Sequence, residues 1–326
     1  MTRVAINGFG RIGRAFYKLA KEKPELQIVA VNDLGNLENL EYLLKYDSIY
    51  GNWGGKFDAK FLSEKDPSKL PWKELGVDIV VESSGAFESF NKARAHIQAG
   101  AKRVVITAPA KDDDTADSKT VLMGVNEEDL KACVITSNGS CTTNSASPIM
   151  QILSEKLGIK KAFLNTVHGY TATQSLVDSP AKGEDYRRGR AAAINIVPST
   201  TGAAIAVGRA VHELLGKFDG VAMRVPVSTG SLSAICFVSE RETTPDEINS
   251  ILENAAKEPR WHGILTTTRD QIVSTDIIGN PYAAVADLSL THVTGKDLCA
   301  VYSWYDNEMG YTHTLVDHVI KLGLYI

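Results

Sequence analysis

Cys141 is the residue of this chain whose surroundings most favour chemistry. It lies in the run Ser137 to Asn144, between a strand-like segment at 132–136 and an apolar, helix-like segment at 146–157. At such a junction the unpaired N–H groups and the positive end of the helix dipole stabilise a thiolate, which lowers the cysteine pKa from its free value of about 8.5. The sequence therefore predicts a nucleophilic cysteine at the start of a helix.

The other three cysteines have a different setting. Cys133, Cys236 and Cys299 each lie inside an apolar stretch, where a free cysteine usually packs as a small hydrophobic residue. We interpret them as structural. The four cysteines show no spacing typical of a disulfide framework or a zinc site, and no His-x-x-x-His pair occurs, so we expect no metal site.

A second candidate catalytic residue, His168, ends a strand-like segment at 162–167. A glycine and several hydroxyl residues follow it, a context that favours a histidine acting as an acid or a base. Arg224 lies inside an apolar strand pattern, where a guanidinium needs an anion, and phosphate is the obvious candidate. Between the two, the run Pro198 to Gly202 precedes a helix-like segment at 203–215; its hydroxyls can bind an anion or can simply cap the helix.

The rest of the C-terminal half predicts an α+β domain. Further strands are expected at 230–240, 272–278 and 299–304, with a helix at 245–256 that covers one face of their sheet. The segment from Ser175 to Asn195 is polar and has no clear periodicity. A structureless stretch of this length inside a compact domain is usually functional or contacts another subunit.

The N-terminal half predicts the partner that would accept electrons. A strand at 4–6 leads into a glycine-rich turn and then into apolar residues at helical spacing. Gly8 permits the tight turn, Gly10 lets the backbone approach a pyrophosphate, and Gly13 lets helix and strand pack closely. The next strand ends at Asp33, about 20 residues further on, where a carboxylate can accept both ribose hydroxyls. The sequence predicts a dinucleotide site, and NAD is favoured because the carboxylate repels a 2′-phosphate.

The same alternation of strand and helix continues through 77–81, 91–98 and 103–106. It predicts a Rossmann-type, doubly wound parallel sheet, with Thr107 at the carboxyl edge where a nicotinamide should lie. A chain of 326 residues favours about two domains. We expect an NAD-binding domain at 1–140, completed by a C-terminal helix at 306–326. A catalytic domain with a mostly antiparallel sheet should occupy 141–305.

The bulk properties restrict the partners of the chain. A net charge of −4 gives no basic surface for nucleic acid or anionic membrane. No apolar run approaches the ~20 residues that a membrane span needs. The N-terminus leads straight into a strand without a secretory signal, so we expect a cytoplasmic protein.

Taken together, these motifs closely resemble phosphorylating glyceraldehyde-3-phosphate dehydrogenase of the bacterial and eukaryotic type. The similarity covers almost the whole chain and is carried by NGFGRIGR from Asn7, SNGSCTTN from Ser137, VHGYTATQ from Val167, PSTTGAA from Pro198 and SWYDNE from Ser303. The resemblance implies an oxidoreductase of glycolysis and gluconeogenesis that converts glyceraldehyde 3-phosphate to 1,3-bisphosphoglycerate with NAD. It also implies a homotetramer.

The resemblance further implies a role for each site residue. Cys141 would attack the aldehyde to form a thiohemiacetal, His168 would act as base, and hydride transfer would leave a thioester that inorganic phosphate attacks. The implied NAD contacts are Arg11, Ile12, Asp33, Lys65, Thr107 and Asn307, the last at the nicotinamide carboxamide. The implied attacking-phosphate site is Ser140, Thr142, Thr201 and Gly202, and the substrate phosphate would contact Thr171 and Arg224, with Arg188 nearby.

The chain departs from the family pattern in a few places, none of them at Cys141 or His168. Ser145 replaces a second cysteine that the family commonly has, and Lys65 stands where the family often has arginine. The segment from 51 to 69 is shorter than usual by what looks like one hairpin. An acidic residue usual to the family is absent at 232–234.

Three other functions remain open. Erythrose-4-phosphate dehydrogenase hydrolyses its thioester, but relatives of that kind usually depart at the ATQ run or at the glycine of the TTG run, and both are intact here. Against an NADP-preferring, biosynthetic enzyme stand Asp33 and Pro180. A non-catalytic binding protein on the same fold would have lost Cys141, His168 or Arg224, and all three are present.

Overall fold

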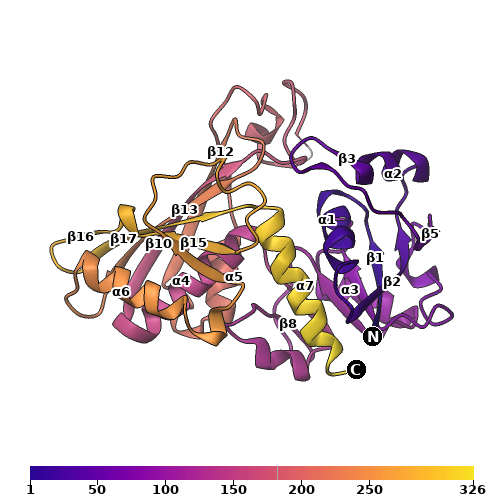
Figure 1. The fold of residues 1–326 in the computed structure, drawn as a ribbon, viewed down its shortest axis with the longest axis horizontal. Coiled ribbons are helices and arrows are strands. Elements are labelled where there is room, and N and C mark those ends of the chain that lie inside the picture. The colour runs from indigo at the N-terminus through magenta and orange to yellow at the C-terminus, as the bar shows by residue number, and fades with distance from the viewer. Residues whose placement is uncertain (182) are drawn as a thin grey trace. The chain divides into compact units, whose positions relative to one another are not determined.

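The computed structural model describes residues 1–181 and 183–326, which form two compact units. Met1–Ser140 and Thr312–Ile326 form the first unit, and Cys141–Tyr311 forms the second. Each unit has its own large sheet and its own helices (Figure 1). Within the described ranges, none of the helices has both the length and the apolar character that a membrane span requires.

The first unit is built on a seven-stranded sheet in which every pairing is parallel. Its order is β5-β2-β1-β6-β7-β9-β8. The strands are β1 (Thr2–Asn7), β2 (Leu26–Asn32), β5 (Lys60–Leu62), β6 (Ile79–Glu82), β7 (Arg103–Ile106), β8 (Ser118–Thr120) and β9 (Ile135–Ser137). The chain runs outward from β1 to β5 and then restarts at β6 on the other side of β1. This reversal of strand order confirms the predicted doubly wound sheet.

The central strands of this sheet are buried on both faces. All four residues of β6 and the last four of β1 are buried, as expected for parallel strands that are covered on both sides. The helices are α1 (Arg11–Ala20), α2 (Leu37–Lys45) and α3 (Phe90–Gln98), with 3-10 turns η1 (Pro67–Lys69) and η2 (Glu127–Lys131). A short ribbon pairs β3 (Tyr46–Asp47) with β4 (Gly51–Asn52).

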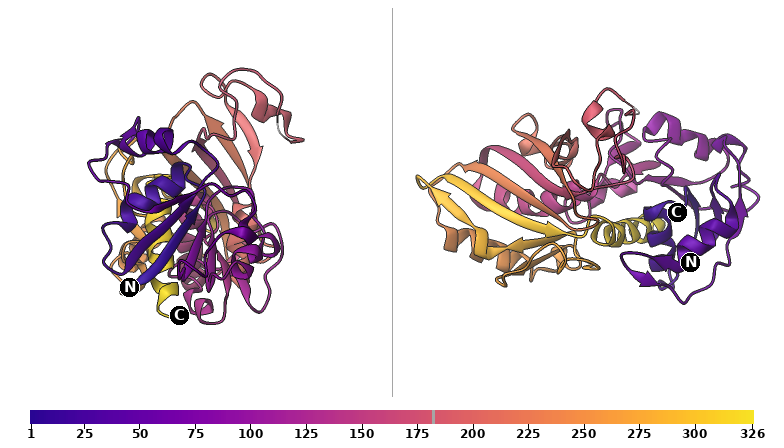
Figure 2. Two further views of the ribbon diagram at one scale, coloured as in Figure 1. Left: turned by 90° about the vertical axis from the view of Figure 1, so that its right-hand side faces the viewer. Right: turned by 90° about the horizontal axis from the view of Figure 1, so that it is seen from above.

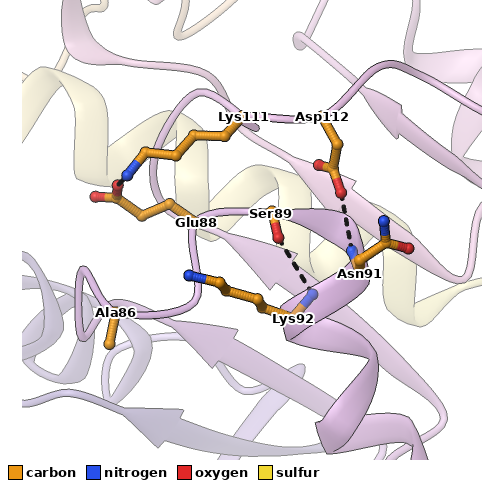
Figure 3. A pocket seen from close by; sticks show the side chains of 7 residues that line it. All are labelled: Ala86, Glu88, Ser89, Asn91, Lys92, Lys111 and Asp112. Carbon is orange, nitrogen blue, oxygen red and sulfur yellow. Dashed lines mark hydrogen bonds and ion pairs between the residues drawn. The ribbon is translucent and has the colours of Figure 1, made fainter.

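Helix α3 begins where side chains satisfy its free N–H groups. The Ser89 hydroxyl accepts from the N–H of Lys92 at 3.2 Å, and the Asp112 carboxylate accepts from Phe90 and Asn91 at 2.7 and 3.0 Å (Figure 3). A carboxylate at this position also complements the positive end of the helix dipole.

The end of the chain completes the first unit through helix α7 (Met309–Gly323). His318 on this helix contacts the Thr136 hydroxyl at 2.8 Å and the Asn138 side-chain oxygen at 3.1 Å. Lys321 donates to Glu127 at 2.6 Å. The helix begins three residues later than the expected position 306, because Asp306 accepts from the N–H groups of Glu308 and Met309 and so caps its first turn.

The second unit contains an eight-stranded mixed sheet in the order β11-β12-β10-β13-β17-β15-β14, with β16 paired to β17. Only β10 with β12 and β14 with β15 are parallel. The strands are β10 (Ile159–Gly169), β11 (Val197–Thr200), β12 (Phe218–Val225), β13 (Ser231–Ser239), β14 (Leu265–Thr268), β15 (Ala284–Asp287), β16 (His292–Thr294) and β17 (Leu298–Tyr305). The predicted mostly antiparallel sheet is therefore confirmed.

Three helices pack on one face of this sheet: α4 (Cys141–Leu157), α5 (Ala203–Ala210) and α6 (Pro245–Ala255) (Figures 1 and 2). Short 3-10 turns are η3 (Tyr186–Gly189), η4 (His212–Leu214), η5 (Pro259–Trp261) and η6 (Leu288–Leu290). Along β13 and β17, buried residues alternate with more exposed ones, as a strand with one covered face requires.

Several sequence predictions about the second unit are wrong in detail. The segment expected as a strand at 272–278 forms turns instead. Three of its residues carry a hydroxyl or a carboxylate, and two turn hydrogen bonds lie within it. The helix expected at 203–215 ends at Ala210 and continues as η4. Cys236, interpreted as structural, is exposed because it lies on the open face of β13.

Candidate active site

A cavity of about 420 Å³ lies at the carboxyl ends of β1, β2 and β6, at the reversal of strand order. This is the place where open α/β sheets bind ligands. Its lining includes Gly8, Gly10, Asp33, Lys65, Ser84 and Phe87. We call it the cofactor cleft. Of the predicted cofactor residues, the structure thus brings two glycines, Asp33 and Lys65 together.

Two of the predicted glycines, Gly8 in the cleft lining and Gly13 in α1, are required by their surroundings. Gly8 has a φ of +97°, and a Cβ there would lie 2.4 Å from the backbone nitrogen of Ser84. A Cβ at Gly13 would lie 2.2 Å from the carbonyl oxygen of Gly8. Any side chain at these positions would therefore separate α1 from the strand edge. Gly10 is the N-cap of α1, and among the described residues no side chain caps the helix at that point.

The Asp33 carboxylate is held at the rim of the cleft by backbone donors. It accepts from the N–H of Phe9 at 2.6 Å and from the N–H of Gly35 at 2.7 Å. The side chain is half-buried, so one edge stays open to a ligand. This position fits the predicted contact with ribose hydroxyls.

Five predicted cofactor residues are not among those that line the cleft: Arg11, Ile12, Gly13, Thr107 and Asn307. The Arg11 side chain pairs with Asp47 at 3.1 Å, and Arg11 and Ile12 are the first two residues of α1, directly after Gly10 of the cleft lining. Thr107 follows the carboxyl end of β7, as predicted, and its N–H bonds to the carbonyl of Glu82. Thr107 is not one of the residues that line the cleft.

The floor of the cleft is a buried polar network that the sequence reading missed. One Glu82 oxygen accepts from Asn7 at 2.5 Å and contacts His96 at 2.9 Å; the other accepts from the N–H of Ser84 at 2.8 Å and from its hydroxyl. Because Trp72 donates to Nδ1 of His96 at 3.0 Å, the His96 proton is on Nε2 and points at Glu82. The sequence feature that could have indicated this network is Glu82 itself, a glutamate at the end of an apolar strand.

A second cavity, of about 280 Å³, lies beside the start of α3 (Figure 3). Its lining includes Ser89, Asp112 and the ion pair of Lys111 with Glu88. The helix N–H groups that could bind an anion there already bond to Ser89 and Asp112. We assign no role to it.

The catalytic candidates come together in the second unit. Cys141 is the first residue of α4, and its Sγ lies 3.3 Å from Nε2 of His168 on β10. Arg224 lies directly across from His168 in the pairing of β10 with β12. Adjacent strands and one helix start thus place a thiol, an imidazole and a guanidinium within contact of one another.

The protonation of this cluster differs from the sequence expectation. Burial raises the pKa of the Cys141 thiol, although the Arg224 guanidinium and hydrogen bonds from Thr142 and from the backbone oppose the effect. The lowered pKa predicted from the helix N-terminus is therefore wrong for the free protein, because burial of the thiol outweighs the charge and the hydrogen bonds that favour the thiolate. Burial and the Arg224 charge lower the pKa of His168 to about 3. The cluster rests as a neutral imidazole beside a thiol.

Arg224 determines which nitrogen of His168 carries the proton. Its Nη1 lies 2.6 Å from Nδ1 of His168 and 3.1 Å from the carbonyl oxygen of Gly169. A guanidinium can only donate, so while Arg224 holds this contact Nδ1 accepts and the ring proton lies on Nε2, directed at Cys141; the Gly169 carbonyl oxygen can only accept and favours the proton on Nδ1 instead. Nδ1 also lies 2.6 Å from the Gly169 oxygen. If Arg224 moves away, Nδ1 can carry the proton and Nε2 becomes free to accept one.

The remaining predicted anion residues lie on the nearby elements of the same unit. Arg188 on η3 donates to the Ser199 hydroxyl at 2.8 Å. Burial lowers the pKa of Arg224, and the nearby charge of Arg188 adds a smaller lowering. Thr201 accepts from the N–H of Ala203 at 3.2 Å, and Gly202 is the N-cap of α5. The Thr171 hydroxyl contacts Thr173 at 2.9 Å.

Two more predicted residues are anchored at strand ends. The side-chain oxygen of Asn307 accepts from the N–H of Gly230 at 3.0 Å and from the hydroxyl of Ser231 at 3.2 Å. This leaves its amide nitrogen as a donor. Ser140 immediately precedes Cys141 in the sequence and is half-buried.

Tyr305, near the end of β17, belongs to the catalytic cluster but was not a sequence candidate. Its hydroxyl contacts the Thr142 hydroxyl and the Thr166 hydroxyl, both at 2.8 Å. Its ring lies edge-on to the ring of His168, with centroids 5.9 Å apart. Its position in the SWYDNE run was the only sequence signal.

Comparisons with known proteins agree with this arrangement of domains and site. Residues 2–90 match the family model described as glyceraldehyde 3-phosphate dehydrogenase, NAD binding domain, and residues 140–307 match the model of the C-terminal domain of the same enzyme. These two matches cover the cofactor cleft and the catalytic cluster respectively.

Curated relatives align over nearly the full chain. The chain is 48% identical to glyceraldehyde-3-phosphate dehydrogenase of Thermotoga maritima, with 97% of this chain and 98% of the relative covered. It is 46% identical to the protein of that name from Streptomyces coelicolor, with 98% of both covered. It is 44% identical to that of Clostridium pasteurianum, with 97% of both covered.

Proposed function

Because the chain belongs to the glyceraldehyde-3-phosphate dehydrogenase family, we propose that it oxidises D-glyceraldehyde 3-phosphate to 1,3-bisphosphoglycerate with NAD and inorganic phosphate. The observation that carries this proposal is the contact of Cys141 with His168 at 3.3 Å, beside Arg224. A nucleophile, a base and a phosphate-binding cation are the groups that this reaction needs. All three groups belong to residues that were predicted from the sequence.

The residues of the cofactor cleft fit NAD. The uncapped start of α1 can bind a pyrophosphate, and the close approach at Gly8 and Gly13 brings backbone N–H groups to it. Asp33 fits the ribose hydroxyls and disfavours a 2′-phosphate. We propose Lys65 as a further contact because it lines the cleft, and Asn307 as a donor to the carboxamide through its amide nitrogen. NAD, when bound, supplies the hydride acceptor.

The cluster can activate the thiol in two stages. With Arg224 on Nδ1, His168 keeps its proton on Nε2 and cannot take one from Cys141. We propose that the substrate phosphate draws Arg224 away, with Thr171 and Arg188 as neighbouring donors. Nδ1 can then bond to the Gly169 oxygen, and Nε2 can accept the proton as Cys141 attacks the aldehyde. Nε2 would return this proton to the alkoxide oxygen, which gives the thiohemiacetal, and would accept it again from that hydroxyl as the thioester forms.

The attacking phosphate has a separate candidate site in the proposal. Thr201 and Gly202 lie at the start of α5, and Ser140 and Thr142 flank Cys141. Hydroxyls and N–H groups at two helix starts suit a dianion. Inorganic phosphate bound there would attack the thioester carbon and release the acyl phosphate, which restores the thiol.

We also propose a homotetramer of the family type. The face of the second sheet opposite α4, α5 and α6 exposes Phe163, Val167 and Leu298, so an apolar surface is left uncovered in one chain. The segment from 175 to 195, apart from residue 182, exposes apolar residues such as Leu176 and Ile194. Such surfaces support contacts with further copies.

The domain roles and the location follow from the same proposal. Met1–Ser140 with the final helix would be the NAD-binding domain, and the second unit would be the catalytic domain. Four free cysteines and a net charge of −4 support a reducing, cytoplasmic location and a place in glycolysis or gluconeogenesis.

Steady-state formation of NADH tests the proposal. The purified protein is assayed with glyceraldehyde 3-phosphate and NAD, with and without inorganic phosphate, beside an assay with NADP. Phosphate-dependent turnover that prefers NAD is expected. Turnover that ignores phosphate would instead indicate a hydrolytic enzyme such as erythrose-4-phosphate dehydrogenase, and no turnover with either cofactor would indicate a binding protein.

A further inference from the structure

A chain of hydrogen bonds runs beneath the cofactor cleft, across the carboxyl ends of three neighbouring strands. Glu82, at the end of β6, accepts from the side-chain amide of Asn7 at 2.5 Å, and Asn7, at the end of β1, accepts from that of Asn32 at 2.7 Å. Asn32, at the end of β2, forms two bonds with the main chain of Glu64, since it donates to the carbonyl oxygen and accepts from the N–H, both at 2.9 Å. The three side chains are nearly fully buried. We call Glu82, Asn7 and Asn32 the amide chain.

The segment at 64–72 is held at both of its ends by the same network. Its first residue, Glu64, bonds to the amide chain directly. Its last residue, Trp72, donates to Nδ1 of His96 at 3.0 Å, and Nε2 of His96 lies 2.9 Å from the carboxylate of the amide chain. Glu64 and Lys65 line the cofactor cleft, so this segment forms part of its wall. The position of that wall therefore depends on bonds made beneath the cleft.

The amide chain has one direction, because it ends in a carboxylate, which can only accept. The amide nitrogen of Asn7 must therefore face Glu82, and its oxygen must face Asn32. Asn32 then directs its nitrogen at Asn7 and at the Glu64 carbonyl oxygen, which uses both amide protons, and its oxygen is left for the N–H of Glu64. A reversed amide at either position would place donor against donor. Glu82 thus determines, through two side chains, whether Glu64 is held.

We propose that the amide chain positions the 64–72 segment, and with it Lys65, for the binding of NAD. Both amide protons of Asn32 are used within the network, so it acts on the cofactor through the segment and is a positioning residue. Lys65 is the residue of the segment that offers a cation in the cleft lining to a ligand with two phosphates. The proposal deepens the proposed function, since it rests on NAD as the ligand of the cofactor cleft.

The two bonds from Asn32 hold a piece of main chain that lies between regular elements. Strand β5 ends at Leu62 and η1 begins at Pro67, so Glu64 belongs to neither. A segment that becomes ordered only when its ligand binds reduces the affinity, whereas a segment that is already in place does not. Loss of the amide chain should therefore loosen the segment and weaken NAD binding together.

The test measures the exchange of main-chain hydrogen for deuterium in the protein without ligand and, separately, the Kd for NAD by calorimetry. Asn32→Leu should speed exchange in peptides from 63–72 about tenfold and raise the Kd for NAD about tenfold, because the bonds to Glu64 are lost. Peptides from 231–239, a strand of the second unit, should exchange as in the parent. Asn91→Leu, which makes the same change at an exposed position, is the matched control.

A pair of substitutions tests the direction of the amide chain. Glu82→Gln can direct an amide donor at Asn7, which reverses Asn7 and Asn32 and releases Glu64. Asn7→Asp in that background restores an acceptor between Asn32 and position 82. The double variant should therefore recover at least about half of the change in exchange and in Kd that Glu82→Gln causes, on a logarithmic scale. Asn7→Asp alone places two carboxylates together and should be the most disturbed of the set.

Three results would overturn the proposal. They are parent-like exchange at 63–72 in Asn32→Leu, faster exchange there with an unchanged Kd for NAD, and a double variant that is no better than Glu82→Gln alone. Where one of these proteins does not fold, as judged by circular dichroism, the other comparison decides. The exchange measurement needs no ligand. A parent protein that binds no NAD would therefore refute the proposed function, and the exchange rates would still decide whether the amide chain holds the segment.

Discussion

The floor of the cofactor cleft and the catalytic cluster are both buried and polar, but they balance charge in opposite ways. Beneath the cleft, one carboxylate, Glu82, faces donors from Asn7, Ser84 and His96, so the anion is fully matched. In the catalytic cluster, among the described residues, Arg224 has no carboxylate partner, and it faces a neutral imidazole and a raised-pKa thiol. The hydrogen bonds of Glu82 in the first site are complete without a ligand. In the proposed function, the substrate phosphate supplies the anion that the second site lacks.

This difference in charge balance predicts that the two sites will respond differently to the substitution of a buried charged residue. A satisfied network fixes shape, so disturbing it should alter cofactor binding and stability. An unmatched cation next to a nucleophile favours the ligand that neutralises it, so disturbing it should alter the chemistry. The following predictions test that contrast.

The largest effect is expected at the nucleophile of the catalytic cluster. Cys141→Ser should lower kcat for NADH formation by about a thousandfold or more, because a serine hydroxyl stays protonated beside a neutral imidazole. The KM for NAD should stay the same. Cys236→Ser is the matched control and should retain full activity, because that thiol is on the open sheet face. A Cys141→Ser enzyme with more than a tenth of the parent activity would contradict the assignment.

The next effect is expected at the unmatched cation. Arg224→Met should lower kcat/KM for glyceraldehyde 3-phosphate about a hundredfold, since a charged hydrogen bond to phosphate is lost. Turnover of glyceraldehyde, which has no phosphate, should not fall, because removal of Arg224 frees Nδ1 of His168. Arg241→Met, which breaks a surface ion pair with Glu247, is the control. Equal losses with both aldehydes would show that Arg224 acts on something other than the phosphate.

A smaller effect is expected beneath the cleft. Glu82→Gln places an amide donor against the donors of Ser84, Asn7 or His96, so the KM for NAD should rise about tenfold and the free energy of unfolding should fall by about 2 kcal/mol. The KM for glyceraldehyde 3-phosphate should not change. Glu88→Gln, in the half-exposed ion pair with Lys111, serves as control for both readouts. A change in kcat with unaltered NAD binding would contradict the proposed difference between the two sites.

The last effect, which bears on stability and not on turnover, is expected on acidification. Burial lowers the pKa of His168 and of His318 to about 3, while an unfolded histidine has a pKa of about 6.5. Between these values the unfolded chain binds more protons, so stability is lost as pH falls below about 6.5, by about 1.4 kcal/mol per pH unit for each histidine. Urea unfolding from pH 7.5 to 4.5 should show this slope.

A histidine variant isolates the contribution of burial. His318→Gln should reduce the slope by the share of one histidine, whereas His262→Gln, at an exposed position, should leave it as it is. If the His318→Gln variant kept the full slope, then burial would not be what holds these rings neutral.

Much of this molecule could be predicted from the sequence because the motifs are local. The glycines at 8 and 13, Asp33 and the strand-to-helix position of Cys141 each follow from short-range patterns, and the structure places them as expected. The parallel sheet follows from the alternation of strands and helices in the first 140 residues. The segment at 272–278 was predicted as a strand because of its short apolar runs, but such runs occur in loops as well.

What could not be predicted depends on burial and on long-range contacts. The pKa of Cys141 was expected to be low from its helix start, yet desolvation, which depends on the whole second unit, reverses the sign. The contact of Glu82 with His96, and that of Tyr305 with Thr142 and Thr166, join residues distant in sequence, so no local pattern shows them.

The most direct test of the central claim is to look for the thioester itself. The protein is mixed with NAD and glyceraldehyde 3-phosphate in phosphate-free buffer, quenched with acid, and analysed by intact mass and peptide mapping. We predict a burst of about one NADH per chain and an acyl group on Cys141 that disappears when inorganic phosphate is added before the quench. Sustained NADH formation without phosphate, or a burst with no acyl group on Cys141, would contradict the account.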